Sequence, residues 1–277
     1  MRILISADME GVTGVTCSED VEVGSPRWDY FRALLTADVN AAVAGFAEGG
    51  ADEIVVNEAH ASKRNLLLGQ LDDRALALVG NHKPFGMMEG IQDRPDAVAF
   101  VGYHTGAGRQ GVLSHTYIST SIVDVRVNGR PASEGAMNAI LAAEFGVPVV
   151  LVTGDDLCCE DAAEWAPDAQ RVAVKTCVDR YTARCLAPAK TAAMIRAAAG
   201  RAVTDAWPAT PEPPAGPFRY EVEFDAVQQA AAVTAIPCVE QTSERQVAFT
   251  LPTMAEAIRC FKAVTVLATN ATDPRYG

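Results

Sequence analysis

The sequence predicts an α/β fold: a mostly parallel, doubly wound sheet with helices on both faces, followed by a small C-terminal α/β appendage. Short apolar runs at residues 3–5, 53–57 and 97–102 have the composition of strands that are buried on both faces. A segment with apolar residues at helical spacing separates the first two runs. A strand, a helix and a strand in succession require a crossover, and therefore parallel pairing. The 277 residues are enough to bury a large core.

The first half of the chain alternates between helical and strand patterns. Apolar residues at helical spacing predict a helix over residues 28–47, which ends at the glycine pair 49–50. Residues 66–79 are expected to hold a small helix and a further strand. Residues 122–127 alternate between apolar and polar side chains and lead into the turn residues 128–129, which is typical of a β-hairpin.

The same alternation continues after the hairpin. A helix is predicted over residues 134–145, with Ser133 as its N-cap. Residues 147–153 have the pattern of another buried strand. Residues 172–176 predict a shorter strand, and residues 187–199 an alanine-rich helix.

The chain is expected to divide at a proline-rich stretch. Residues 207–217 show no periodicity and many prolines, which indicates a linker. We therefore expect an α/β domain that carries the functional site over residues 1–206 and a small α/β tail over residues 218–277. Within this tail, strands and helices are predicted at residues 220–224, 226–235, 246–251 and 254–267.

Composition and charge exclude several classes of partner. The chain carries 23 Lys and Arg against 35 Asp and Glu, a formal net charge of −12, and its isoelectric point is near 4.8. Such a surface repels nucleic-acid backbones, and no basic run with interleaved aromatic residues offsets it. No apolar run approaches the roughly 20 residues that span a bilayer. We expect no nucleic acid and no membrane as partners.

Cysteine usage and the N-terminus predict a cytoplasmic location. The seven cysteines are an odd number without a CxxC pair, and Cys158 and Cys159 are adjacent, which is poor geometry for a mutual bridge. Reduced thiols are therefore expected. Only five mostly apolar residues separate Arg2 from Asp8, too few for the apolar core of a signal peptide.

Acidic and imidazole side chains follow the predicted strands at the points where these strands end. Asp8 and Glu10 come directly after the first strand, and residues two apart on an extended backbone project from the same face. His60 and His104 each follow a further buried strand. Because the carboxyl ends of parallel strands lie along one edge of a sheet, these four side chains can meet in one crevice. Glu134, at the start of a predicted helix, is a candidate fifth member.

Such a cluster predicts a metal site. Two acids aimed at one point repel each other unless a cation, a shared proton or a basic partner lies between them. Carboxylates and imidazoles are the ligands of di-zinc and similar hydrolytic sites, in which one carboxylate can bridge two ions. Taken alone, each residue also has a structural interpretation: an acidic pair in a solvated turn, hydrogen-bonded loop histidines, and a favourable charge at a helix N-terminus. The metal site is favoured because independent elements place the same chemistry at the same edge.

Further polar residues have other interpretations. His115 lies apart from the other histidines, so it is free for acid/base work; a further metal ligand and a polar core residue are the alternatives. Asp155 and Asp156 also follow a strand, but Gly-Asp-Asp favours a structural turn or an outer layer of the site. His82 lies in a polar loop and is not included.

Short motifs spread over nearly the whole chain carry a family resemblance. They are SADMEGVTG (6–14), VNEAH (56–60), KPFGMMEG (83–90), GYHT (102–105), LSHT (113–116), NGRPASEGAMNA (128–139), VTGDD (152–156), AVK (173–175) and CLAPAK (185–190). In this order they resemble the bacterial zinc D-aminopeptidases, the family of the dipeptide-transport-operon D-aminopeptidase. Residues 16–27 and the tail after residue 217 match less distinctly.

The resemblance implies a zinc-dependent enzyme that removes N-terminal residues, D-amino acids such as D-Ala, from short peptides. It implies two Zn²⁺ per subunit and a ring-shaped homodecamer whose active sites face an inner chamber. The implied metal ligands are Asp8, which bridges both ions, Glu10, His60, His104 and Glu134. His115 would be the catalytic histidine. Glu58 departs from the family pattern, which more often has Asp before the small residue and the histidine.

The residues by themselves leave two other functions open. A dinuclear-metal hydrolase with another substrate, such as an L-aminopeptidase, an amidase or a phosphoesterase, would use the same ligands with a different pocket. A non-catalytic, metal-stabilised peptide-binding protein would hold metal without turnover. The additional imidazole of His115 argues against the second function, because a structural metal site has no use for it.

Overall fold

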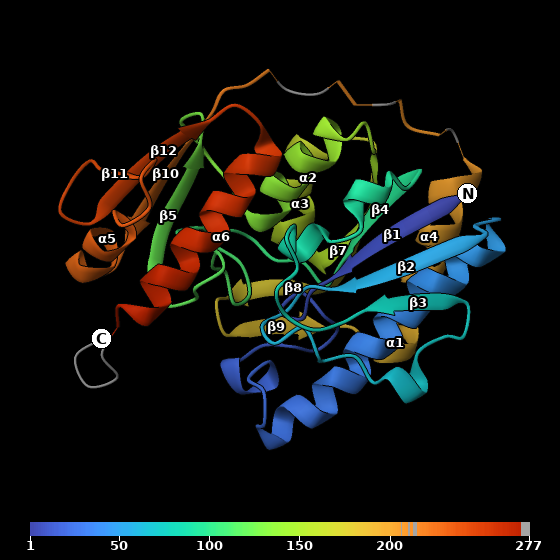
Figure 1. Ribbon diagram of the computed structural model, residues 1–277. Coiled ribbons are helices and arrows are strands. Elements are labelled where there is room, and N and C mark those ends of the chain that lie inside the picture. Colours follow the sequence, from blue (N-terminus) through green and yellow to red (C-terminus); the bar gives the residue numbers. More distant parts are fainter. Residues whose placement is uncertain (206, 210, 213–214, 273–277) are drawn as a thin grey trace.

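The computed structural model describes residues 1–205, 207–209, 211–212 and 215–272. These residues form a seven-stranded sheet with helices on both faces and, beside it, a smaller five-stranded sheet with two helices (Figure 1). The predicted α/β class with a mostly parallel sheet is confirmed. Within the described part of the chain, no helix combines the length and the apolar character needed to cross a bilayer.

The large sheet places β1 next to β2 and β4. Its strands, in spatial order, are β3 (Ala75–Leu78), β2 (Glu53–Glu58), β1 (Arg2–Ala7), β4 (Ala97–Val101), β7 (Val149–Asp155), β8 (Gln170–Asp179) and β9 (Thr182–Cys185). All neighbours are parallel except β9, which is antiparallel to β8. Ala7, the last residue of β1, pairs with both Glu58 and Val101. The chain therefore leaves these three strands at the same level of one sheet edge.

Helices cover both faces of this sheet. The helices α1 (Pro26–Glu48) and α4 (Pro188–Thr204) pack together on one face, and α2 (Glu134–Glu144) and α3 (Asp156–Trp165) lie on the other (Figure 1). Successive residues of β1 enter different cores: Ile3 and Ile5 pack with α1, whereas Leu4 packs on the side of α2. Two buried faces explain why the strand sequences are continuously apolar.

The smaller sheet is antiparallel and draws strands from two distant parts of the chain. Its order is β11 (Glu240–Gln241), β12 (Gln246–Leu251), β10 (Phe218–Phe224), β5 (Ile122–Val127) and β6 (Arg130–Pro131). The helices α5 (Val227–Val233) and α6 (Met254–Asn270) pack against each other, and α6 also contacts α2. The division into residues 1–206, 207–217 and 218–277 stays a prediction, and part of the proposed linker lies outside the described residues.

Some elements were not expected from the sequence. The helix α3 begins at the Gly-Asp-Asp segment, where the Asp155 carboxylate accepts a hydrogen bond from Cys158 N at 2.7 Å and so caps the helix. The strand expected at residues 172–176 is longer and forms a hairpin with β9. The described residues also include four short 3₁₀ turns: η1 (Ser18–Asp20), η2 (Leu68–Gln70), η3 (Gly86–Met88) and η4 (Ile91–Asp93).

The turns after β1 and β4 touch through glycine backbone. Gly11 N donates to Gly102 O at 2.8 Å, and a Cβ on Gly11 would lie 1.9 Å from Tyr103 O. Gly102 has a φ of +74°, and a Cβ there would lie 2.2 Å from Asp8 O. Only glycine fits both positions, and their contact fixes the separation of the two turns.

Gly102→Ala should destabilise the protein by about 2 kcal/mol or more, because it adds both left-handed backbone strain and a backbone clash. Urea unfolding followed by circular dichroism measures the loss. Gly69→Ala is the control, since a Cβ at Gly69 meets nothing within 4 Å. Equal unfolding midpoints for Gly102→Ala and the unmodified protein would contradict the close approach.

Candidate metal centre

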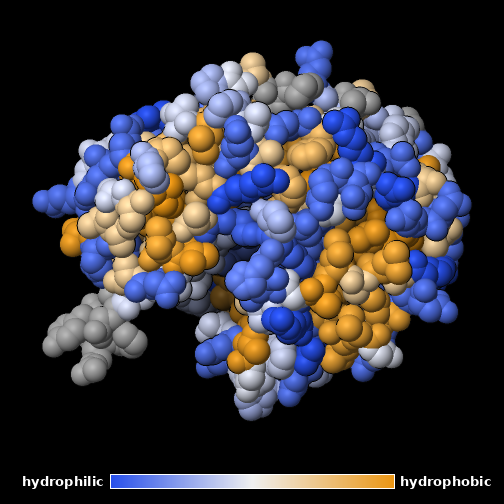
Figure 2. All heavy atoms as spheres, viewed as in Figure 1, coloured by the Kyte–Doolittle hydropathy of each residue, from blue (hydrophilic) through white to orange (hydrophobic). Residues whose placement is uncertain are grey.

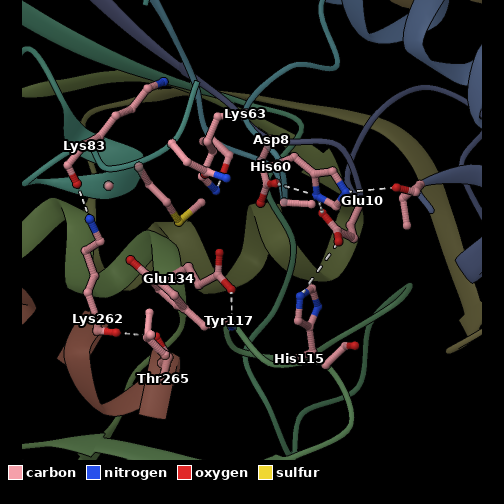
Figure 3. Close-up of a pocket in the computed structure, with 18 of the residues that line it drawn as sticks. Asp8, Glu10, His60, Lys63, Lys83, His115, Tyr117, Glu134, Lys262 and Thr265 are labelled. Atoms are coloured by element: carbon pink, nitrogen blue, oxygen red, sulfur yellow. Dashed lines mark hydrogen bonds and ion pairs between the residues drawn. The ribbon is translucent and has the colours of Figure 1, made fainter. Parts of the chain in front are cut away.

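The structure brings all six predicted site residues together at the edge where β1, β2 and β4 end. Figure 3 labels five of them, all except His104. Asp8 and Glu10 lie in the turn after β1, His60 and His104 follow β2 and β4, and Glu134 is the first residue of α2. The sixth residue, His115, lies on the loop between β4 and β5. All six side chains are buried.

The Asp8 carboxylate lies between two histidines. Its Oδ1 is 3.4 Å from His60 Nδ1, and its Oδ2 is 3.4 Å from His104 Nε2. On the first side, Glu10 Oε2 is 3.0 Å from His60 Nδ1; on the second, Glu134 Oε2 is 3.8 Å from His104 Nε2. The ligand atoms within each of these two groups lie within 4.8 Å of one another. Asp8 therefore belongs to two adjacent groups of possible metal ligands.

Backbone carbonyls orient the three imidazoles. His104 Nδ1 lies 2.9 Å from Thr105 O, and His115 Nδ1 lies 2.9 Å from Leu113 O. His60 uses its other nitrogen, with Nε2 3.1 Å from Val21 O. Because a carbonyl oxygen only accepts, each of these nitrogens carries a hydrogen, and the second nitrogen of each ring faces the carboxylates. Such a hydrogen bond to the far nitrogen is typical of metal-binding histidines.

Two atoms of the cluster show why a cation fits here. Asp8 Oδ2 and His104 Nε2 are fully buried and have no hydrogen-bond partner in the part of the chain that the structure describes. They face each other at 3.4 Å without the geometry of a hydrogen bond. Buried polar atoms are otherwise almost always paired, so the donor set fits a site for a metal cation.

The same charges perturb the pKa values of the cluster. Burial raises the pKa of Asp8, but the neighbouring His104 and His60 outweigh it and hold this pKa well below its usual range. Burial lowers the pKa of His104, but Glu134 and Asp8 oppose it and raise the value to about 10. The cluster thus retains positive charge between its carboxylates, which a metal ion would supply in place of protons.

A cavity of about 680 Å³ opens on this cluster. It is lined by five of the six residues, all except the buried His104. Tyr117 also lines the cavity, and its backbone N donates to Glu134 Oε1 at 2.6 Å, which fixes that carboxylate. The volume lies in the range of small-molecule sites.

Lys175 is a supporting residue whose role the sequence did not predict. It lies on β8 and is 1% exposed, and its Nζ donates to Glu10 O at 2.6 Å, Val12 O at 3.0 Å and Val15 O at 2.7 Å. Burial lowers the pKa of Lys175 to about 8, although Asp155 opposes the shift. Three acceptors require the three hydrogens of the ammonium form. The available signal was a lysine placed directly after the apolar run 172–174 of this strand.

Glu58 holds the loop that carries His60. Its Oε1 accepts from His60 N at 3.1 Å and from Asn65 Nδ2 at 3.0 Å, and its other oxygen accepts from Asn65 N. Asn65 Nδ2 also donates to His60 O at 2.9 Å. The departure from the family pattern at this position therefore affects the support of His60 and not the cluster itself.

Buried carboxylates and imidazoles at the carboxyl edge of a parallel sheet, beside a cavity, define a metal-dependent hydrolase. A family model described as D-aminopeptidase matches residues 1–263. The chain is 31% identical over 269 residues to the D-aminopeptidase of Bacillus subtilis (strain 168), covering 97% of this chain and 98% of that protein. The solved structure of the "Zn-dependent D-aminopeptidase DppA from Bacillus subtilis, a self-compartmentalizing protease" has a TM-score of 0.93 at 31% identity, covering 97% of this chain and 98% of that one.

The chain belongs to the D-aminopeptidase family. The predicted resemblance and the expectation that the chain is a peptidase of this type are confirmed.

Lys175→Met should lower the free energy of unfolding by roughly 3–5 kcal/mol, because it leaves three buried carbonyls without donors. Urea unfolding measures the change. Lys190→Met, an exposed position on α4, is the matched control and should unfold like the unmodified protein. If both variants share one midpoint, the Lys175 hydrogen bonds do not support the turn.

Proposed function

We propose that this protein is a zinc-dependent aminopeptidase that removes N-terminal D-residues such as D-Ala from short peptides. The observation that carries the proposal is the Asp8 carboxylate, placed between two groups of ligand-type side chains beside the cavity. Membership of the D-aminopeptidase family supports the reaction and its stereochemistry. The Zn-dependence named for the Bacillus subtilis structure supports the metal.

The proposed site holds two zinc ions per subunit. Glu10 and His60 would hold one ion and His104 and Glu134 the other, and Asp8 would serve both; the two groups that share Asp8 support this arrangement. When bound, the ions supply a hydroxide near neutral pH and polarise the scissile carbonyl. The protein holds these ligands rigidly, through the carbonyls that fix the imidazoles and through Tyr117 N on Glu134.

His115 is the proposed catalytic residue. Its ring stacks on His104 with centroids 4.3 Å apart and an interplanar angle of 7°, and its Nδ1 is fixed by Leu113 O. Its Nε2 faces the cavity side of the cluster, 3.8 Å from Glu10 Oε1. Nε2 is therefore the atom at which this chain can give a proton to the departing amine.

The proposal includes assembly of several subunits into a ring-shaped homodecamer whose sites face an inner chamber. The Bacillus subtilis structural relative is described as a self-compartmentalizing protease, which supports assembly. The edge strand β3 and its flanks expose apolar side chains, with Leu76 63%, Leu68 55% and Val79 43% exposed, and Figure 2 shows an apolar area on this side of the molecule. A cytoplasmic location is also proposed, and the free thiols of all seven cysteines support it.

His104→Ala should lose most bound zinc, because it removes the imidazole between Asp8 and Glu134. His115→Ala should keep its zinc and lose about 100-fold or more in kcat on D-Ala–D-Ala, because it removes only the proton donor. Elemental analysis and hydrolysis assays separate the two effects. His82→Ala is the control for metal content. Full hydrolysis by a zinc-depleted His104→Ala protein would refute the site.

The purified protein should hydrolyse D-Ala–D-Ala faster than L-Ala–L-Ala, and a chelator should abolish the activity until zinc is restored. A panel that adds simple amides and a phosphate monoester distinguishes the other hydrolases considered from the sequence. Bound zinc without turnover of any of these compounds would indicate a binding protein and contradict the proposal.

A further inference from the structure

One wall of the cavity carries lysine side chains. Lys63 follows β2, Lys83 follows β3 and Lys262 lies on α6, and all three line the same cavity as the carboxylates and imidazoles. In Figure 3, Lys83 and Lys262 lie on the opposite side of the view from Glu10 and His115. Lys63 lies nearer to Asp8 and His60 in the same view, so the positive side of the cavity is the one that carries Lys83 and Lys262.

Lys83 has no donor left for a ligand. Its Nζ donates to Asn57 Oδ1 at 2.7 Å, Glu58 O at 2.8 Å and Leu78 O at 2.7 Å, which uses all three hydrogens of the ammonium. It is 8% exposed and fixed among these acceptors. Lys83 contributes its charge to this wall, but it is not free to turn toward a ligand.

Lys262 and Lys63 have donors to spare. Lys262 Nζ donates to Lys83 O and Lys63 Nζ donates to Ala59 O, one hydrogen bond each among the described residues. In the same part of the chain, no carboxylate forms an ion pair with either ammonium. The carboxylate of Glu89, on the same side, is occupied by Phe85 N and Gln92 Nε2.

The three ammonium groups repel one another. Burial lowers the pKa of Lys262; Glu89 opposes this shift and Lys63 adds to it. Burial also lowers the pKa of Lys83, to about 8, and both Lys63 and Lys262 contribute in the same direction. A bound anion would relieve this repulsion and accept the free hydrogens.

We infer that Lys262 and Lys63 bind the C-terminal carboxylate of a short peptide substrate. The inference rests on the proposed aminopeptidase function, because a di- or tripeptide has its amine and its carboxylate at opposite ends, as the cavity has its acidic and its cationic walls. Both ends are recognised at once only when the peptide is short. The lysines therefore select short peptides with a free carboxylate and disfavour amidated or long ones.

The test compares D-Ala–D-Ala with its C-terminal amide. We expect the unmodified zinc enzyme to have a kcat/KM at least about 10-fold higher for the acid. In Lys262→Met and Lys63→Met this ratio should fall at least about 5-fold, through a higher KM for the acid. The intrinsic reactivities of the two peptides are the same for every variant, so the change in the ratio reports the contact with the carboxylate.

Two further variants serve as a replacement and as a control. Lys262→Gln removes the charge but retains a donor for Lys83 O, so it replaces Lys262→Met if that protein does not fold. Lys190→Met, outside the cavity, should leave the ratio unchanged. An unchanged ratio in both lysine variants, or equal use of the acid and the amide by the unmodified enzyme, overturns the inference while the peptidase stands. Hydrolysis of neither peptide overturns the proposed function, and the inference with it.

Discussion

The site depends on the parallel register that makes β1, β2 and β4 end at one level. Ala7 pairs with Glu58 and with Val101, so Asp8 leaves its strand beside the segments that carry His60 and His104. In a strand, a slip of one residue turns every side chain to the other face. The glycine contact between the turns after β1 and β4 also holds the ends of these two strands at the same height in the sheet. Buried apolar side chains on both faces of the sheet hold this register, so the hydrophobic core positions the polar site.

The register also creates an electrostatic cost that nearby groups must offset. Asp8, Glu10 and Glu134 are buried carboxylates at one point, and such groups are stable together only with positive charge between them. The imidazoles of His60 and His104 supply part of that charge. Lys175 acts differently, because its ammonium binds the backbone carbonyls of the turn and not a carboxylate oxygen. The turn is thus tied to β8, a strand at a distance in the sheet.

Much of the fold and the positions of the candidate ligands could be predicted because both follow from local sequence. An apolar run indicates a buried strand, and a polar residue just after it lies at the strand end, as Asp8, His60 and His104 do. The prediction missed features whose local sequence signal is weak or which depend on residues far apart in the chain. The helix α3 buries only Cys158 and Ala162, so its apolar periodicity was too faint to detect. Lys175 acts on a turn 160–165 residues earlier, and no sequence spacing encodes such a contact.

The cavity is built from two parts of the protein with different tasks. The residues proposed for hydrolysis come from the edge of the large sheet, the loop that follows β4 and the start of α2, whereas one wall comes from α6, which packs on the smaller sheet (Figure 1). Substitutions along the exposed turns of α6 can reshape that wall without disturbing the register of the large sheet. Sequence changes confined to this single C-terminal helix would therefore alter the range of accepted peptides while the residues of the metal centre stay the same.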